Sequence, residues 1–86
     1  MLTLISYDLK CPGRDYTALY ESIKSLGEWW HYLESIWILN SDSNVTQIAQ
    51  ILRTKIDEND LLFVVDITEK PVDGWLPRAA WEWMKK

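Results

Sequence analysis

The chain has 86 residues, of which 9 are basic and 13 acidic, so it fits a single domain (residues 1–86) with a net charge of −4. The acidic balance argues against binding nucleic acid through bulk positive charge, and a single histidine excludes a multi-histidine metal site within one chain. One cysteine, Cys11, excludes an internal disulfide, and without a signal-peptide pattern or a long apolar run we expect a cytoplasmic protein.

The chain begins with a predicted strand and a predicted helix. Residues 2–8 are rich in strand formers and end in Asp8. Apolar residues then recur at helical spacing through residues 14–27, where Asp15 is suited to be the N-cap and Gly27 to end the helix.

Four further elements follow. Residues 28–41 are too long for one ordinary strand, and the polar pair at 34–35 predicts a hairpin. Residues 43–57 begin with a capping-box pattern and predict a second helix. Residues 60–69 are β-rich and nearly continuously apolar, so we expect a strand that lies inside the sheet or under a partner. Residues 74–86 predict a short terminal helix with a proline near its start.

The order strand, helix, strand, strand, helix, strand predicts an α+β fold of the ferredoxin-like (split βαβ) class with a short C-terminal helix. In this topology the end of the first strand lies beside the start of the last strand. We therefore expect Asp8 near Asn59 and Asp60, with Ser35 as a further neighbour. Asp66 should lie toward the other end of the sheet, which argues against an Asp8/Asp66 acid–base pair.

Asp8 has two interpretations. It is either a turn residue or a carboxylate that holds magnesium, because Mg²⁺ takes hard oxygen ligands and often only one or two protein carboxylates. Such an ion would serve phosphodiester hydrolysis. Asp60 is either a solvated turn residue or a second metal carboxylate. The hydroxyls of Tyr7 and Ser35 would bind either a ligand or backbone groups.

The segment "LISYDLK", followed by a helix that ends in "SLGEWWHYLESIWIL", resembles the CRISPR-associated protein 2 family. The matching residues are Tyr7, Asp8, Gly27, Ser35, Ile36 and Trp37. A closer resemblance, through "PGRDYTALYESIKSLGEWWHYLESIWI" and "GWLPRAAWEW", is to short bacterial and phage proteins often labelled "SinR family".

This resemblance implies a homodimer of ferredoxin-like subunits, sheet against sheet, with the two Asp8 side chains near the two-fold axis. In that family these aspartates serve magnesium-dependent cleavage of RNA or DNA in some members and a purely structural role in others, so the resemblance implies Asp8 as the catalytic residue if this chain is a nuclease. The basic run that commonly follows in that family is missing, and only Lys10 and Arg14 flank the acid as candidate substrate-binding residues.

The six tryptophans lack an interleaved basic stripe, so core packing and subunit contact are favoured over base stacking. The candidates for contact with a second subunit or another partner are Trp37, Trp75, Trp81 and Trp83. Trp81 and Trp83 cannot share one helix face, so one of them should face solvent or a partner.

Two hypotheses follow for function. The first is a dimeric, magnesium-dependent endonuclease that uses Asp8 of each subunit. The alternative is a non-catalytic homodimeric interaction module of a phage-defence, counter-defence or toxin–antitoxin system, in which the segment from Gly74 onward binds a protein partner and is dispensable for folding. Small-ligand binding between subunits is compatible with the fold, but no motif favours it.

Overall fold

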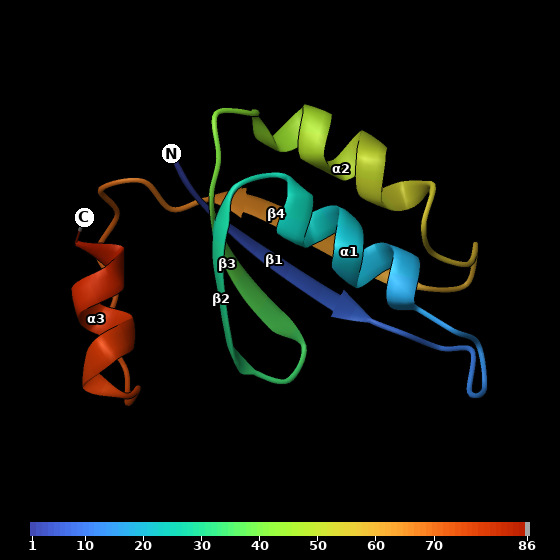
Figure 1. Cartoon of the computed structure of the whole chain (residues 1–86), viewed down its shortest axis with the longest axis horizontal. Helices are drawn as coiled ribbons and strands as arrows, with labels where there is room; N and C mark the ends of the chain where they lie inside the picture. Colours follow the sequence, from blue (N-terminus) through green and yellow to red (C-terminus); the bar gives the residue numbers. More distant parts are fainter. Residues whose placement is uncertain (86) are drawn as a thin grey trace.

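The computed structural model describes residues 1–85; Lys86, the last residue of the expected terminal helix, lies outside the described residues. The elements in chain order are β1 (Leu2–Asp8), α1 (Thr17–Ser25), β2 (Glu28–Leu33), β3 (Ile36–Asn40), α2 (Val45–Arg53), β4 (Leu61–Asp66) and α3 (Arg78–Met84) (Figure 1). The predicted order of elements is confirmed, although most of them are shorter than the sequence patterns suggested.

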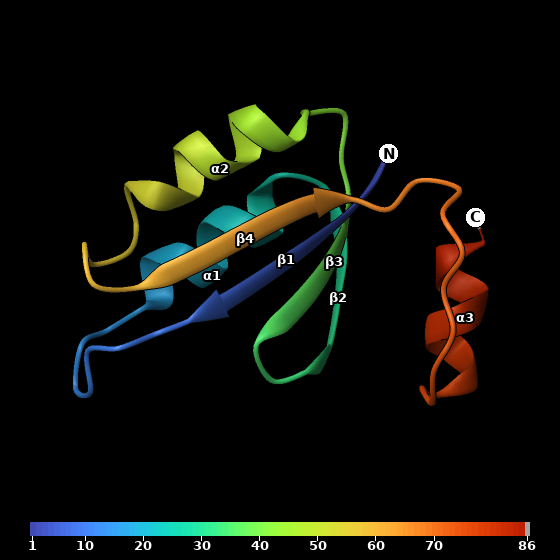
Figure 2. The ribbon, with the colours of Figure 1, turned by 180° about the vertical axis from the view of Figure 1, so that it is seen from behind.

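The four strands form one sheet in the order β2-β3-β1-β4, and every neighbouring pair is antiparallel. The helices α1 and α2 lie together on one side of the sheet, as both views show (Figures 1 and 2). The protein is therefore a small α+β domain. No helix within residues 1–85 is both long enough and apolar enough to cross a membrane.

The strand register places the end of β1 beside the start of β4. Asp8 is paired with Leu61, and Thr3 is paired with Asp66. On the other side of β1, the N–H of Tyr7 donates a hydrogen bond to the carbonyl of Ser35 at 3.2 Å. The expected neighbourhood of Asp8 and the distant position of Asp66 are both confirmed.

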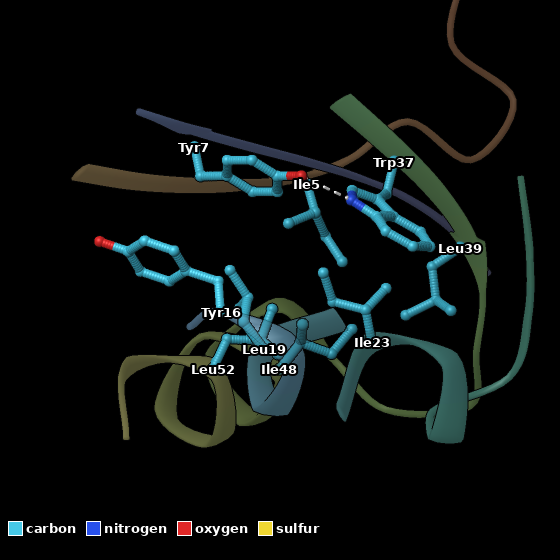
Figure 3. Close-up of a cluster of buried hydrophobic side chains, with 9 residues drawn as sticks. All are labelled: Ile5, Tyr7, Tyr16, Leu19, Ile23, Trp37, Leu39, Ile48 and Leu52. Carbon is cyan, nitrogen blue, oxygen red and sulfur yellow. Dashed lines mark hydrogen bonds between the residues drawn. The ribbon is translucent and has the colours of Figure 1, made fainter. Parts of the chain in front are cut away.

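The main core lies between the sheet and the two helices α1 and α2 (Figure 3). Alternate residues of β1 and β3 point into it, as the two-residue period of a strand requires. Its buried members are Ile5, Tyr7, Tyr16, Leu19, Ile23, Trp37, Leu39, Ile48 and Leu52.

The two helices begin differently. Asn44 and Gln47 form the predicted capping box at the start of α2. At α1 the expectation was off by one residue, because Tyr16 is in the N-cap position and makes no side-chain capping bond. Asp15 instead accepts a hydrogen bond from the N–H of Thr17, which shapes the turn before the helix.

A second, smaller core lies on the opposite face of the sheet. Trp30 and Ile38 are buried there against Ala80 of α3, and Leu4 and Trp83 pack around them. The terminal helix is thus part of the packed domain. Residues after Gly74 supply the cover of this face, so we expect their removal to destabilise the domain.

Candidate functional site

Asp8 lies at the exposed end of β1. Its side chain is 59% exposed and forms an ion pair of 2.7 Å with the Nζ of Lys10, which is also about half exposed. Because side chains alternate along a strand, Asp8 lies on the face of the sheet opposite the main core. This carboxylate is therefore accessible to a metal ion, a ligand or a second protein.

Asp60 directly precedes Leu61, the β4 partner of Asp8, but has a different environment. It is buried, and its Oδ1 accepts a hydrogen bond of 2.6 Å from the N–H of Lys10. The hydroxyl of Tyr16 donates to both carboxylate oxygens at 2.9 and 2.7 Å, and the N–H of Asp57 donates to Oδ2 at 2.8 Å. Both oxygens are thus occupied by protein donors.

These contacts determine how the two groups titrate. Burial acts to raise the pKa of Asp60, but the hydrogen bonds from Lys10, Tyr16 and Asp57 outweigh it and hold that pKa below its usual value. Burial and the hydrogen bond to Asp60 raise the pKa of Tyr16 to about 12. Asp60 therefore serves to join the loop after β1 to the loop before β4, and it has no free oxygen to offer a metal.

Two of the candidate ligand or partner side chains, Tyr7 and Trp37, are used inside the fold, and the backbone carbonyl of Ser35 takes part in strand pairing. The hydroxyl of Tyr7 donates to the carbonyl of Glu34 at 3.4 Å and accepts a hydrogen bond of 3.0 Å from Trp37 Nε1 (Figure 3). The ring of Trp37 is 2% exposed and stacks on His31. Ser35 is in the β2–β3 turn and its carbonyl completes the pairing with β1. Tyr7 and Trp37 are thus core residues rather than substrate or partner contacts.

The two basic residues near Asp8 are both occupied by acids. Lys10 is paired with Asp8, and Arg14 Nη1 lies 3.7 Å from Asp57 Oδ1 with its guanidinium over the ring of Tyr16. Residues 1–85 hold no group of three or more His, Cys, Asp or Glu side chains arranged to bind a metal ion. The site resembles an ion-paired surface more than a preformed cation site.

Sequence reasoning missed a pair of exposed apolar side chains beside Asp8. Leu61 and Phe63 of β4 are 60% and 65% exposed, and together with Ser6 and Asp8 they line a shallow hollow. We name Leu61 and Phe63 the β4 patch. The apolar run of residues 60–69 suggested a covered strand, and only the strand order reveals that β4 is at the edge of the sheet.

The tail tryptophans have different environments. Trp75 is 99% exposed, Trp83 packs against the second core, and Trp81 is half-buried beside Leu2 and Ile67. Of the four predicted contact residues, Trp75 is the one that is fully available to a partner. A comparison with protein-family models and with curated proteins found no match.

Proposed function

We propose that this protein is a homodimeric interaction module with ferredoxin-like subunits. The β-α-β-β-α-β order and the strand order β2-β3-β1-β4 support the ferredoxin-like assignment. The observation that carries the proposal is the β4 patch, since Leu61 and Phe63 are neighbours on one face of an edge strand and are mostly exposed. Exposed apolar surface of this kind marks sites of association.

The size of the domain gives a reason for association. A domain of this length leaves a large share of its surface in contact with water, and a second copy is a direct way to cover apolar side chains. A two-fold dimer presents the same patch from each subunit, so one pair of apolar residues serves both halves of the interface.

Trp75 supplies a second contact site in this proposal. Its side chain is 99% exposed and packs against no other part of residues 1–85, so it contributes little to the fold. Tryptophan is among the residues most enriched at the energetic centres of protein interfaces. The module would therefore bind itself through β4 and another protein through the segment around Trp75.

Magnesium-dependent cleavage of nucleic acid is the second candidate. It is favoured by the exposure of Asp8, whose carboxylate could hold Mg²⁺ while water fills the other positions. The neighbouring groups argue for the module instead, since the oxygens of Asp60 are occupied and Lys10 and Arg14 are paired with acids.

The two candidates are separated by one pair of variants. Asp8→Asn removes the exposed carboxylate, and Asp42→Asn removes an exposed carboxylate elsewhere as a matched control. The module predicts that wild type and both variants are equally inactive on single-stranded RNA and DNA with Mg²⁺ or Mn²⁺. Metal-dependent cleavage that Asp8→Asn alone abolishes would establish the nuclease.

Dimerisation has its own test. Leu61→Ser combined with Phe63→Ser should shift the chain from dimer to monomer in light-scattering chromatography, because the interface loses its apolar contacts. Val72→Ser changes an apolar residue that is 52% exposed outside the sheet and should leave the dimer intact. If the double variant dimerises as tightly as wild type, the β4 patch is not the interface.

A further inference from the structure

The outer edge of β4 carries backbone groups without a partner strand. The N–H of Ile67 donates to the carbonyl of Leu2 at 2.9 Å, which identifies the pairs of β1 and β4 that exchange hydrogen bonds. Since such pairs alternate along an antiparallel ladder, the intervening residues point their N–H and C=O groups away from β1. These residues are Leu62, Val64 and Asp66.

This edge lacks the features that protect exposed strands. Residues 61–65 contain no charge and no proline, and a groove beside the strand leaves it open to the approach of another strand. The α2 side of the groove is lined by Val45, Thr46, Ala49, Gln50 and Arg53. An extended backbone that enters here gains hydrogen bonds to β4 and contacts with α2.

We propose that the occupant of this edge is β4 of a second copy, paired antiparallel about a two-fold axis at Val64. This inference rests on the homodimer of the proposed function and adds its geometry. The register places Val64 opposite Val64 and Leu62 opposite Asp66, so all three outward-facing residues form hydrogen-bonded pairs. A register centred on Phe63 would instead place Asp60 opposite Asp66.

Charge complementarity supports the same register. Arg53 lines the groove near Leu62, and it forms no ion pair within residues 1–85. Leu62, Val64 and Asp66 are two residues apart, so their side chains lie on the same face of β4, which is the face that α2 covers. Asp66 of the second copy, opposite Leu62, therefore lies on the same face as Arg53. Within one chain, Asp66 is four residues along β4 from Leu62, or roughly 13 Å. Asp57, Glu58 and Asp60 of the same chain line a hollow beside Arg53 without forming an ion pair with it, and Asp66 of the second copy supplies an acid from the other side of the interface.

The arrangement also brings the β4 patch into lateral contact with side chains of the second copy. On the face opposite α2, Phe63 lies across from Val65 of the second copy, and Leu61 lies across from Ile67. Stacking the sheets face to face would cover the same side chains but leave the outward-facing backbone groups of β4 without partners. Edge pairing gives these backbone groups partners and adds cross-strand contacts to Leu61 and Phe63, and it joins the two sheets into one of eight strands.

This geometry separates the two Asp8 carboxylates. They lie in β1 strands that are three strand spacings apart, and they are offset along the strands by six residues, so they are roughly 25 Å from each other. One metal ion cannot bind both. The shared aspartate pair implied by the resemblance to CRISPR-associated protein 2 is therefore absent from this dimer.

A charge swap tests the pairing. Arg53→Asp and Asp66→Arg each place like charges across the interface twice, so each should raise the dissociation constant measured by sedimentation equilibrium by about tenfold. The combined variant restores two opposite-charge pairs and should return to within about twofold of wild type. Arg78→Glu, which reverses an exposed arginine on α3, is the control and should change nothing.

The outcomes separate this inference from the homodimer itself. A wild-type dimer whose two single variants bind normally, or whose combined variant is not rescued, overturns the β4 pairing and leaves the homodimer standing. A chain that is monomeric at every concentration overturns both. Val64→Pro gives independent support if it abolishes dimers, because it removes an N–H that pairs only across the interface; normal dimerisation of a folded Val64→Pro variant contradicts the pairing.

Discussion

Removing the terminal helix should destabilise the domain strongly. A chain that ends at Asp73 loses Ala80 and its neighbours and uncovers Trp30 and Ile38, which are 5% and 4% exposed in the intact protein. Re-exposing a large apolar side chain costs roughly 1.5–3 kcal/mol, so these two alone cost about 3–6 kcal/mol. The whole free energy of unfolding for a domain of this size is about 4–13 kcal/mol.

Trp75→Ala is the matched control for this truncation. Because the side chain of Trp75 is 99% exposed, its removal should change the free energy of unfolding by less than about 0.5 kcal/mol. Urea unfolding followed by far-ultraviolet circular dichroism measures both variants. If the truncated chain is as stable as the full chain to within about 1 kcal/mol, α3 does not protect the second face of the sheet and the packing argument fails.

Three other variants test the candidate site and its frame. Asp60→Asn turns an amide toward N–H and O–H donors and should lower the thermal midpoint at neutral pH. Folding lowers the pKa of Asp60, so the stabilisation by its carboxylate is fully present above about pH 4. This stabilisation is lost as the pH falls through the pKa that Asp60 has in the folded protein. The pKa of Tyr16 is raised to about 12 in the folded protein, so Tyr16 ionises at a lower pH in the unfolded chain. The free energy of unfolding should therefore fall between about pH 10 and 12. Tyr16→Phe should reduce this fall, as measured by urea titrations at about pH 9 and 11. Gly27→Ala would place a Cβ against the carbonyl oxygen of Asn40, closer than two non-bonded atoms can approach, and should cost about 1–3 kcal/mol in urea unfolding. An unchanged midpoint would contradict this close approach.

Local patterns predicted the elements and their pairing well. The capping box at Asn44, the two-residue alternation of β1 and the polar turn at residues 34–35 each depend on neighbours in sequence, so they can be read without the fold. The order of elements also predicted that Asp8 lies next to the start of β4, and the strand register confirms this position.

The roles of individual site residues depended on distant contacts. Asp60 receives its hydrogen bonds from Lys10 and Tyr16, which are 50 and 44 residues away in the sequence. No local signal distinguishes such a carboxylate from a solvated turn residue or a metal ligand. Trp37 posed the same problem, because a strand residue can point to either face until the sheet and its covering helices are known.

The apolar run of β4 predicted a strand either inside the sheet or under a partner, and it could not distinguish these two positions. An apolar run such as residues 61–65 is typical of a strand covered on both faces, and here it lies at the edge with Leu61 and Phe63 in solvent. Residues 61–65 have the apolar composition of an interior strand but lie at the edge of the sheet, and this combination is the reason for proposing that a second copy pairs with them. It also explains why a chain of net charge −4 would associate through an uncharged strand.

The mass of the protein in solution tests the central claim most directly. Sedimentation equilibrium of the wild-type chain at micromolar to hundred-micromolar concentrations should give twice the 10.2 kDa of one chain, with dissociation only at the lowest concentrations. A mass of one chain throughout that range would contradict the homodimer, and Leu61 and Phe63 would then be an exposed patch without a self-association role.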